Sequence, residues 1–430
     1  MAGLKEKLEK QIPESRDTVR ELIRLHGERV ISQVTVRQVF GGMRGVKGLV
    51  CDTSVVDPDA GLAVRGIPIG QLAGRLPEEI FHLLCTGELP DAEALASLQS
   101  EFQKRSHVPP YVWSVLEALP KDSHPMTMLS TAILVMERDS VFRRRYAEGM
   151  SKDTAWEATL EDCLQLLAKL PAIAAGIYRR HSHRGAPLPS DPRRDWAGGY
   201  AYLLGLSDPS GEFANLLRLY LTLHCDHEGG NVSAFACHTV GSALSDPYYA
   251  ISAGLNGLAG PLHGLANQEC LQFVLDVRKK FSGVPTDAQL REYAWEILKQ
   301  GRVIPGYGHA VLRITDPRFT ALHRFGERAC ADDEVFRIVD RVFAVVPEVL
   351  REQGKAKDPW PNVDAISGAL LYHFGLTEFD YYTVLFGVSR ALGLCAQLIL
   401  NRALGAPITR PKSVSVEGIK SSFRAAQPAA

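Results

Sequence analysis

An all-α fold is the class that the sequence predicts, and three observations lead to it. Apolar residues recur at helical spacing through most of the 430-residue chain. The segments carry signals that begin and end helices, such as Thr286 before one helix and Gly229-Gly230 after another. Stretches rich in Val and Thr, which are typical of strands, are confined to residues 34–55, where small strands or irregular loop are expected.

The expected helices follow one another along the chain. Two charged amphipathic helices are predicted at 4–11 and 16–25. The next are predicted at 78–84, 92–103, 126–136, 162–178, 214–224, 232–244, 249–255 and 263–281. A helix over 287–300 follows the Thr286 N-cap, and the last helices are expected at 335–353 and 381–404. Residues 354–361 are expected to form a loop, and residues from about 421 to 430 to be disordered.

Composition limits the classes of partner. A chain of this length can bury a large core and usually divides into two domains. The net charge of −1 gives no reason to expect nucleic acid or an anionic membrane as a partner. The most apolar stretch, 391–400, is too short to span a bilayer, and no signal or transit peptide is recognised at the start. Eight scattered cysteines without a Cys-x-x-Cys pair indicate reduced, mostly buried thiols in a soluble intracellular protein.

Three short segments each set one titratable side chain among Gly, Pro and small residues. They are NGLAGPLHGLANQE at 256–269, which contains His263; IPGYGHAVLR at 304–313, which contains His309; and PNVDAISG at 361–368, which contains Asp364. Backbone of this kind can approach a ligand closely. The three side chains are therefore candidates for chemistry.

Two histidines and a carboxylate suit the abstraction of a proton next to a carbonyl group. The carboxylate takes a carbon-bound proton, one imidazole donates to the enolate oxygen, and the other polarises the carbonyl under attack. A positioned base contributes on the order of 10²–10⁴ in rate, and one donor to the oxyanion roughly 3–4 kcal/mol. Neither suffices alone, so the set is more informative than any one member.

Each of these residues also has a structural reading. His263 could be a structural histidine, and Asp364 could serve as the N-cap of a helix over 365–374. Arg390 lies within an apolar helix, where its charge needs an anionic partner, either a substrate or an acidic side chain. These readings stay open on the residues alone.

Taken together, the segments resemble the citrate synthase family, in its branch typical of mitochondria, over about residues 34–412. Further segments that carry the resemblance are GGMRGVKGLV at 41–50, HCDHEGGNVSA at 224–234, GSALSDP at 241–247, YYTVLFGVSR at 381–390 and RPK at 410–412. The resemblance implies condensation of oxaloacetate with acetyl-CoA, followed by hydrolysis of citryl-CoA. It makes Asp364 the base, His263 the donor to the thioester enol, and His309 the group acting on the oxaloacetate carbonyl.

The resemblance also implies which residues bind substrates. For oxaloacetate they are His227, Asn231, Arg318, Arg390 and Arg410, with Arg410 expected to reach the partner subunit's site. For coenzyme A they are Arg44, Lys152, Val303, Gly306, Gly308 and Arg313. Lys152 stands where relatives carry Arg, which puts that one contact in doubt because Lys lacks the bidentate fork. The family uses no metal and no cofactor other than the co-substrate acetyl-CoA.

An architecture follows from the same resemblance. A large helical domain is expected from residues 1–263 and 376–430, with a small helical domain inserted at 264–375 and a homodimer as the assembly. The absent transit peptide and a shorter segment near 76–77 favour a bacterial cytoplasmic protein, and the mitochondrial matrix is the alternative for a mature eukaryotic form.

Two rival functions remain beside the leading one. A 2-methylcitrate synthase would use propionyl-CoA through the same residues, and one methylene changes binding by only about 1–3 kcal/mol. A non-catalytic paralogue that senses coenzyme A or a metabolite would be free to lose the base or an imidazole. All three candidate groups are present here, which argues against the sensor.

Overall fold

The computed structural model describes residues 3–309 and 311–424, and it is predominantly helical, as the sequence predicts. Two long helices, α9 (Ala155–His181) and α19 (Tyr382–Ala403), pack against each other through the centre of the larger part. The segment Phe379–Ala403, which includes α19, is long and apolar enough to cross a membrane by length and composition. Its most apolar part, 391–400, is by itself too short to do so. Since 83% of the apolar window within Phe379–Ala403 is buried inside the protein, α19 has the properties of a core helix.

The helices around this pair form most of the core. They are α4 (Pro77–Thr86), α5 (Ala92–Arg105), α6 (Pro110–Ala118), α7 (Pro125–Val135), α8 (Val141–Ala147), α10 (Trp196–Leu204), α11 (Glu212–Leu223), α12 (Val232–Ser242) and α13 (Pro247–Leu258). Short 3₁₀ turns occur at η1 (Met136–Asp139), η2 (Lys152–Thr154) and η3 (Phe379–Tyr381).

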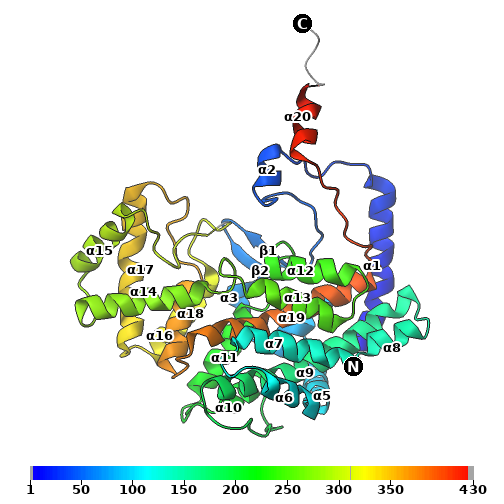
Figure 1. Cartoon of the computed structure of the whole chain (residues 1–430), viewed down its shortest axis with the longest axis horizontal. Helices are drawn as coiled ribbons and strands as arrows, with labels where there is room; N and C mark the ends of the chain where they lie inside the picture. Colours follow the sequence, from blue (N-terminus) through cyan, green and yellow to red (C-terminus); the bar gives the residue numbers. More distant parts are fainter. Residues whose placement is uncertain (1–2, 310, 425–430) are drawn as a thin grey trace.

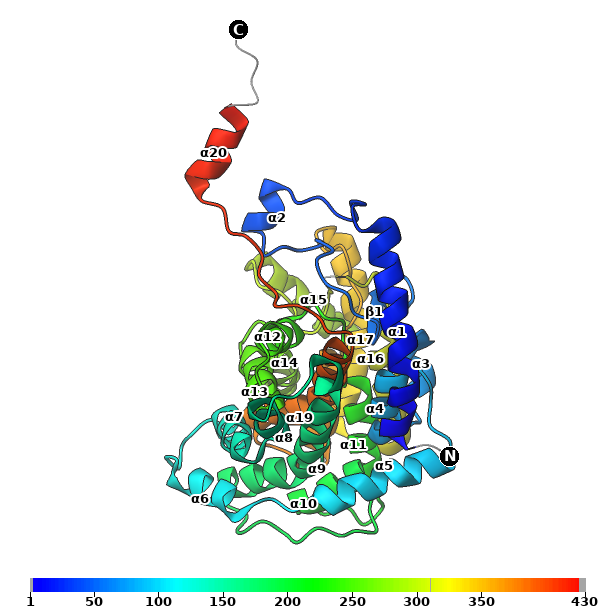
Figure 2. The same ribbon diagram turned by 90° about the vertical axis from the view of Figure 1, so that its right-hand side faces the viewer.

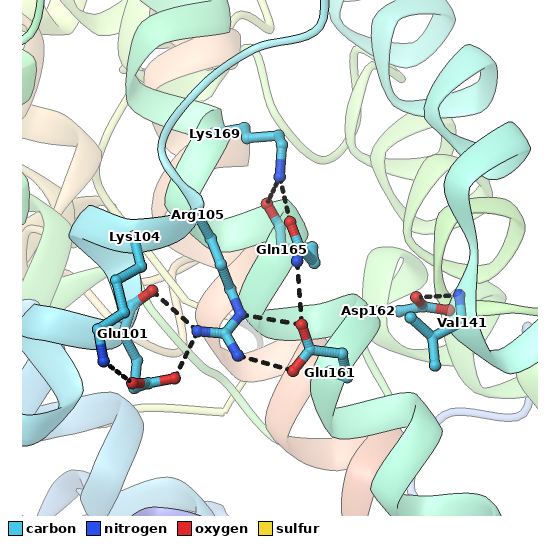
Figure 3. A network of polar contacts seen from close by, with 8 residues as sticks. All are labelled: Glu101, Lys104, Arg105, Val141, Glu161, Asp162, Gln165 and Lys169. Carbon is cyan, nitrogen blue, oxygen red and sulfur yellow. Dashed lines mark hydrogen bonds and ion pairs between the residues drawn. The ribbon is translucent and has the colours of Figure 1, made fainter.

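Polar side chains tie α5 to α9 at the edge of this core (Figure 3). The Arg105 guanidinium donates to both carboxylate oxygens of Glu161, at 2.9 and 2.8 Å, and it also pairs with Glu101 on its own helix. The Asp162 carboxylate accepts the backbone N–H of Val141 at 2.7 Å and so fixes the start of α8. These bonds hold the long α9 in register with its neighbours.

A small antiparallel sheet precedes the helical core. Its strands are β1 (Ser54–Asp57), β2 (Gly61–Val64) and β3 (Ile67–Pro68), in the order β1-β2-β3. Val55 lies opposite Ala63, and Val64 opposite Ile67. The short helix α3 (Ile69–Leu72) follows directly. The sheet lies mostly after the 34–55 region that was expected to hold strands.

A second group of helices packs largely on itself at one end of the molecule (Figure 1). It comprises α14 (Ala266–Phe281), α15 (Asp287–Lys299), α16 (Pro317–Ala329), α17 (Glu334–Gln353) and α18 (Asp364–His373). The group falls within the range predicted for the small domain, 264–375, and α16 also contacts α3 and α11 of the larger part. The domain boundary itself stays a prediction.

Two arms extend from the body: the chain from the end of α1 (Leu4–His26) to the exposed α2 (Val36–Phe40), and the chain from α19 to α20 (Val416–Arg424) on the same side (Figure 2). The arms carry exposed apolar side chains, among them Val30, Ile31, Phe40, Ile408, Val416 and Phe423. Apolar side chains gathered on extended segments are typical of surfaces that another chain covers.

Several predicted boundaries were wrong for identifiable reasons. The two helices expected at 4–11 and 16–25 are one continuous α1, because Pro13 removes a single backbone donor without ending the helix. Residues 421–424 are helical in α20, although disorder was expected from about 421; residues 425–430 lie outside the described residues. α14 begins at Ala266 rather than at 263, so His263 lies in the turn before it. α6, α8, α10, α16 and α20 were not predicted.

Candidate active site

The loops that carry His309 and Asp364 are bonded to each other. The Gly308 N–H donates to Trp360 O at 3.0 Å, and the Asn362 N–H donates to Gly306 O at 2.9 Å. Gly306 has φ of +80°, and a Cβ there would lie 2.8 Å from the Cβ of Ala365. Only glycine meets both conditions without strain. His309 and Asp364 are thus held on one rigid unit.

The Asn362 side chain strengthens this unit, and sequence reasoning missed it. Its amide donates to Gly308 O at 3.1 Å, and its Oδ1 accepts the N–H of Asp364 at 3.0 Å. Asp364 is the first residue of α18 and makes no side-chain cap. The alternative reading of Asp364 as an N-cap was therefore wrong, because Asn362 occupies its backbone N–H and leaves the carboxylate free.

The Asp364 carboxylate is buried, and within residues 3–309 and 311–424 no group donates a hydrogen bond to it. Burial raises its pKa to about 6, the Arg318 charge opposes that rise, and the Asp316 charge reinforces it. A carboxylate with a raised pKa is a stronger base and is still ionised at neutral pH.

Backbone donors set the tautomer of His309. The N–H groups of Val311 and Leu312 both donate to its Nδ1, at 3.0 and 2.9 Å. Burial lowers its pKa, and the nearby Arg318 charge lowers it further. The ring is therefore neutral at pH 7, with Nδ1 as an acceptor and the proton on Nε2. Nε2–H is free to polarise a carbonyl oxygen.

In His263 the acceptor is the other ring nitrogen, Nε2. Its Nε2 accepts the Ser233 N–H at 3.3 Å and lies 3.0 Å from the Ser233 hydroxyl. Burial lowers its pKa to about 4, and the Arg390 charge adds to the effect. With Nε2 as acceptor, the neutral ring carries its proton on Nδ1. The structural reading of His263 does not account for this free donor.

Arg318 is a buried cation with a fixed orientation. Its guanidinium contacts the Asp316 carboxylate at 2.7 to 3.1 Å, and Asp316 also caps α16. Although burial opposes it, the Asp316 charge holds the Arg318 pKa above its ordinary value. Asp316 was not predicted, yet its place before Pro at the start of a helix is a recognisable N-cap signal.

Arg390 lies in α19 and is 2% exposed. Its guanidinium donates to His224 O at 3.2 Å, and to Asn231 Oδ1 and Ser233 Oγ at 3.3 Å each. None of these partners is a carboxylate, and within the described chain no acidic side chain forms an ion pair with it. Burial lowers its pKa to about 10, which leaves it charged at pH 7. The alternative of a structural salt bridge is not supported.

The segment before α12 brings His227 and Asn231 to the same place. The His227 ring centre lies 5.9 Å from that of His309, and its pKa is lowered by burial and by the charges of Arg318 and Arg390. The Asn231 side chain caps α12 through the Ala234 N–H and contacts Arg390. Asn231 therefore positions Arg390 as well as the helix.

Two further polar groups here were not predicted. Tyr220 stacks on His224 with ring centres 4.1 Å apart, and both side chains are buried. Tyr220 Oη and His224 Nε2 have no hydrogen-bond partner among the described residues. The charges of Asp364 and Arg390 act on the Tyr220 hydroxyl, which places it beside the catalytic candidates.

The residues expected to bind coenzyme A divide into two sets. Gly306 and Gly308 lie on the His309 loop, and Val303 and Arg313 are exposed on either side of it. Arg44 lies in the turn after α2. Lys152 lies in η2, next to Asp153, whose carbonyl oxygen accepts a hydrogen bond from Arg16. Arg16 also donates to Ala403 O at the end of α19. Figure 1 shows α8, next to η2, at the opposite side from α15 and α17. Among the described residues, neither the Arg44 nor the Lys152 side chain forms a hydrogen bond or ion pair with the His309 loop.

Arg410 is exposed on the segment between α19 and α20 and has no hydrogen bond or ion pair within the described ranges. Across those same ranges, no three His, Cys, Asp or Glu side chains gather as metal ligands. All eight cysteines are free and seven are buried, which confirms the predicted unpaired thiols.

Comparisons with known proteins agree with this geometry. Residues 42–412 match the family model described as citrate synthase, C-terminal domain. The mitochondrial citrate synthase of Xiphias gladius is 48% identical over 428 residues, which cover 97% of this chain and 91% of that protein.

Solved structures show the same fold. The citrate synthase of Pyrobaculum aerophilum has a TM-score of 0.79 at 26% identity, over 90% of this chain and 95% of that one. The enzyme of Thermoplasma acidophilum, in a ternary complex with carboxymethyl coenzyme A and oxaloacetate, has a TM-score of 0.74 at 24% identity, over 90% and 96%. The chain belongs to the citrate synthase family.

Proposed function

We propose that Asp364, His263 and His309 catalyse the condensation of oxaloacetate with acetyl-CoA. The observation that carries the proposal is the hydrogen-bond pattern of the three groups. The Asp364 carboxylate has a raised pKa and no hydrogen-bond donor among the described residues. His263 and His309 are neutral, and the backbone N–H groups that bond to them leave His263 Nδ1 and His309 Nε2 as the donors. Base and oxyanion donors are the groups that enolisation needs.

Oxaloacetate is a dianion, and buried guanidinium groups suit its carboxylates. Arg318 and Arg390 supply two such groups, and their charges lower the pKa of His227, whose ring centre lies 5.9 Å from that of His309. In the Thermoplasma acidophilum structure, oxaloacetate is part of the bound complex. The ketone oxygen of the substrate is expected to face His309 Nε2–H.

The reaction then runs in three steps. Asp364 takes a proton from the acetyl methyl group while His263 Nδ1–H donates to the thioester oxygen, which forms the enol. The enol carbon bonds to the ketone carbon while the enol O–H proton returns to His263 Nδ1, which restores the thioester carbonyl. The ketone oxygen takes the Nε2 proton of His309, and the proton held by Asp364 balances this loss when both groups re-equilibrate with solvent. Water then cleaves the thioester of citryl-CoA and releases citrate and the coenzyme A thiol. Excluding bulk water during the first two steps protects the enol.

Coenzyme A is expected along the exposed side of the His309 loop. Val303 and the Arg313 cation are exposed on either side of this loop, and the backbone at Gly306 and Gly308 lies within it. Arg44, Lys152 and Arg410 belong to the site only if a second subunit supplies them. The apolar arms of α2 and of the chain before α20 support a homodimer in which the subunits exchange these segments.

No metal or other cofactor enters this mechanism, since acid-base groups suffice for each step. The name of the Xiphias gladius relative favours the mitochondrial matrix over the bacterial cytoplasm, which was the leading expectation from the sequence. Either compartment supplies both substrates.

The test is the release of free coenzyme A, followed with a thiol reagent, from purified protein given oxaloacetate and acetyl-CoA. We expect release that depends on oxaloacetate and a higher kcat/KM with acetyl-CoA than with propionyl-CoA. A preference for propionyl-CoA would instead indicate a 2-methylcitrate synthase. A folded protein that binds oxaloacetate but releases no thiol from either would contradict the proposal.

A further inference from the structure

A cavity of about 760 Å³ lies between the two groups of helices. One wall is formed by the turn between α3 and α4 and by α11, and the other by α16. None of the catalytic candidates lines it. Its volume is within the usual range for small-molecule sites.

The lining of this cavity has one sign of charge. Arg75 and Arg218 project from the first wall, and Arg324 and Arg328 from α16, whereas no described Asp or Glu lines it. Polar groups such as Asn215 and Thr320 complete the surface. A recess with cations on both walls concentrates the positive potential and attracts anions.

Three of the four arginines are paired with acidic side chains. Arg218 pairs with Asp195 at 2.7 Å, Arg75 with Glu79 at 3.1 Å, and Arg328 with Glu212 at 3.1 Å. Arg324 is exposed and has no hydrogen bond or ion pair in the described part of the chain. It lies one helical turn before Arg328, and like charges at that spacing repel each other unless an anion lies between them.

The Arg328–Glu212 ion pair joins α16 to α11 beside the cavity, so one ion pair already connects its two walls. A ligand with several oxyanion groups would contact Arg324 and Arg328 on one side and Arg218 on the other. Guanidinium forks bind phosphate and carboxylate oxygens in pairs.

We infer that this cavity binds a small multivalent oxyanion, a polyphosphate or a polycarboxylate, between Arg324 and Arg328 of α16 and Arg218 of α11. The site is separate from that for oxaloacetate. The bound oxyanion connects the two helix groups, in addition to the Arg328–Glu212 ion pair.

Isothermal titration calorimetry tests the inference. Tripolyphosphate and tricarballylate are titrated separately into the whole protein with oxaloacetate present, so that the catalytic anion site is filled. Arg324→Ala and the double variant Arg324→Ala with Arg328→Ala are compared with Arg337→Ala, an exposed arginine of α17 outside the cavity. Because both target side chains are exposed, the variants should fold, and thermal unfolding checks this.

We expect binding of at least one probe at one site per chain, weakened about tenfold by Arg324→Ala and more by the double variant, with Arg337→Ala unchanged. The probe that binds more tightly identifies the chemical class. The inference is overturned if neither probe binds at millimolar concentration, or if the double variant binds as tightly as the unaltered protein.

Discussion

Asp316 and Arg318 form a nearly inaccessible ion pair, with the guanidinium nitrogen 2.7 Å from the carboxylate and side chains 1% and 7% exposed. The pair is local in sequence, and Asp316 also caps the helix on which Arg318 lies. Burial of Arg318 therefore depends on an anion that the chain itself provides. The Asp316 carboxylate occupies Nε and one terminal nitrogen of the guanidinium, so the proposed substrate carboxylate would bind the other.

Replacement of Asp316 by Ala should lower the free energy of unfolding by about 3–5 kcal/mol, because it leaves the Arg318 charge buried without a partner. Oxaloacetate should restore part of this loss by supplying a carboxylate. Urea unfolding with and without oxaloacetate measures both effects. An unchanged midpoint would show that Arg318 does not rely on this pair.

The pH profile of kcat/KM should have an acid limb near pH 6. Below the pKa of Asp364, which burial raises to about 6, the carboxyl is protonated and cannot accept a proton, so activity falls as pH decreases. Asp364→Asn should keep oxaloacetate binding and lose roughly 10²–10⁴ in kcat. Glu269→Gln, at an exposed carboxylate on α14, is the control. Full turnover by Asp364→Asn would assign the base elsewhere.

The two histidines should respond in opposite ways to amide substitutions. A Gln amide reaches the position of Nε2 and an Asn amide that of Nδ1, so His309→Gln and His263→Asn each retain a donor where the mechanism needs one. We expect kcat of each to exceed that of the other amide variant, His309→Asn or His263→Gln, by about tenfold, or roughly 1.4 kcal/mol. Equal activities within each pair would refute the assigned tautomers.

Asn362→Ala should reduce kcat by about 10²-fold while oxaloacetate affinity changes little, because small displacements of a catalytic group are costly. The side chain joins Gly308 O to the Asp364 N–H but is not itself proposed to touch oxaloacetate. Titration calorimetry and steady-state kinetics separate the two effects. Gln272→Ala, at an exposed amide of α14, should leave both unchanged.

Mixed dimers test whether Arg410 acts across subunits. Arg410→Ala and Asp364→Asn are each expected to be inactive alone. If Arg410 serves the partner's site, one of the two sites in each mixed dimer is intact, and a random mixture recovers about a quarter of full activity. Absence of recovery in dimers shown to have exchanged subunits would place Arg410 in its own chain's site.

The sequence predicted what depends on local pattern. The Thr286 capping box begins α15 as expected, and the Gly- and Pro-rich segments around His309 and Asp364 do converge. The apolar pattern of the sequence did not predict α16, because this helix has few apolar residues. Its start signal is Asp316 before Pro317. The roles of Asn362 and Ser233 depend on contacts between distant segments, such as Ser233 with His263, and a single sequence does not reveal such contacts.

The bonded loops have a consequence for how activity is controlled. Asp364, His309 and Arg318 belong to one helix group, whereas His263, His227 and Arg390 come from segments around α12, α13 and α19. A displacement between the groups would carry the base away from the enol donor without disturbing either half. Such a protein could be switched off by separation alone, with every catalytic side chain keeping its own hydrogen bonds, and switched on again without refolding anything.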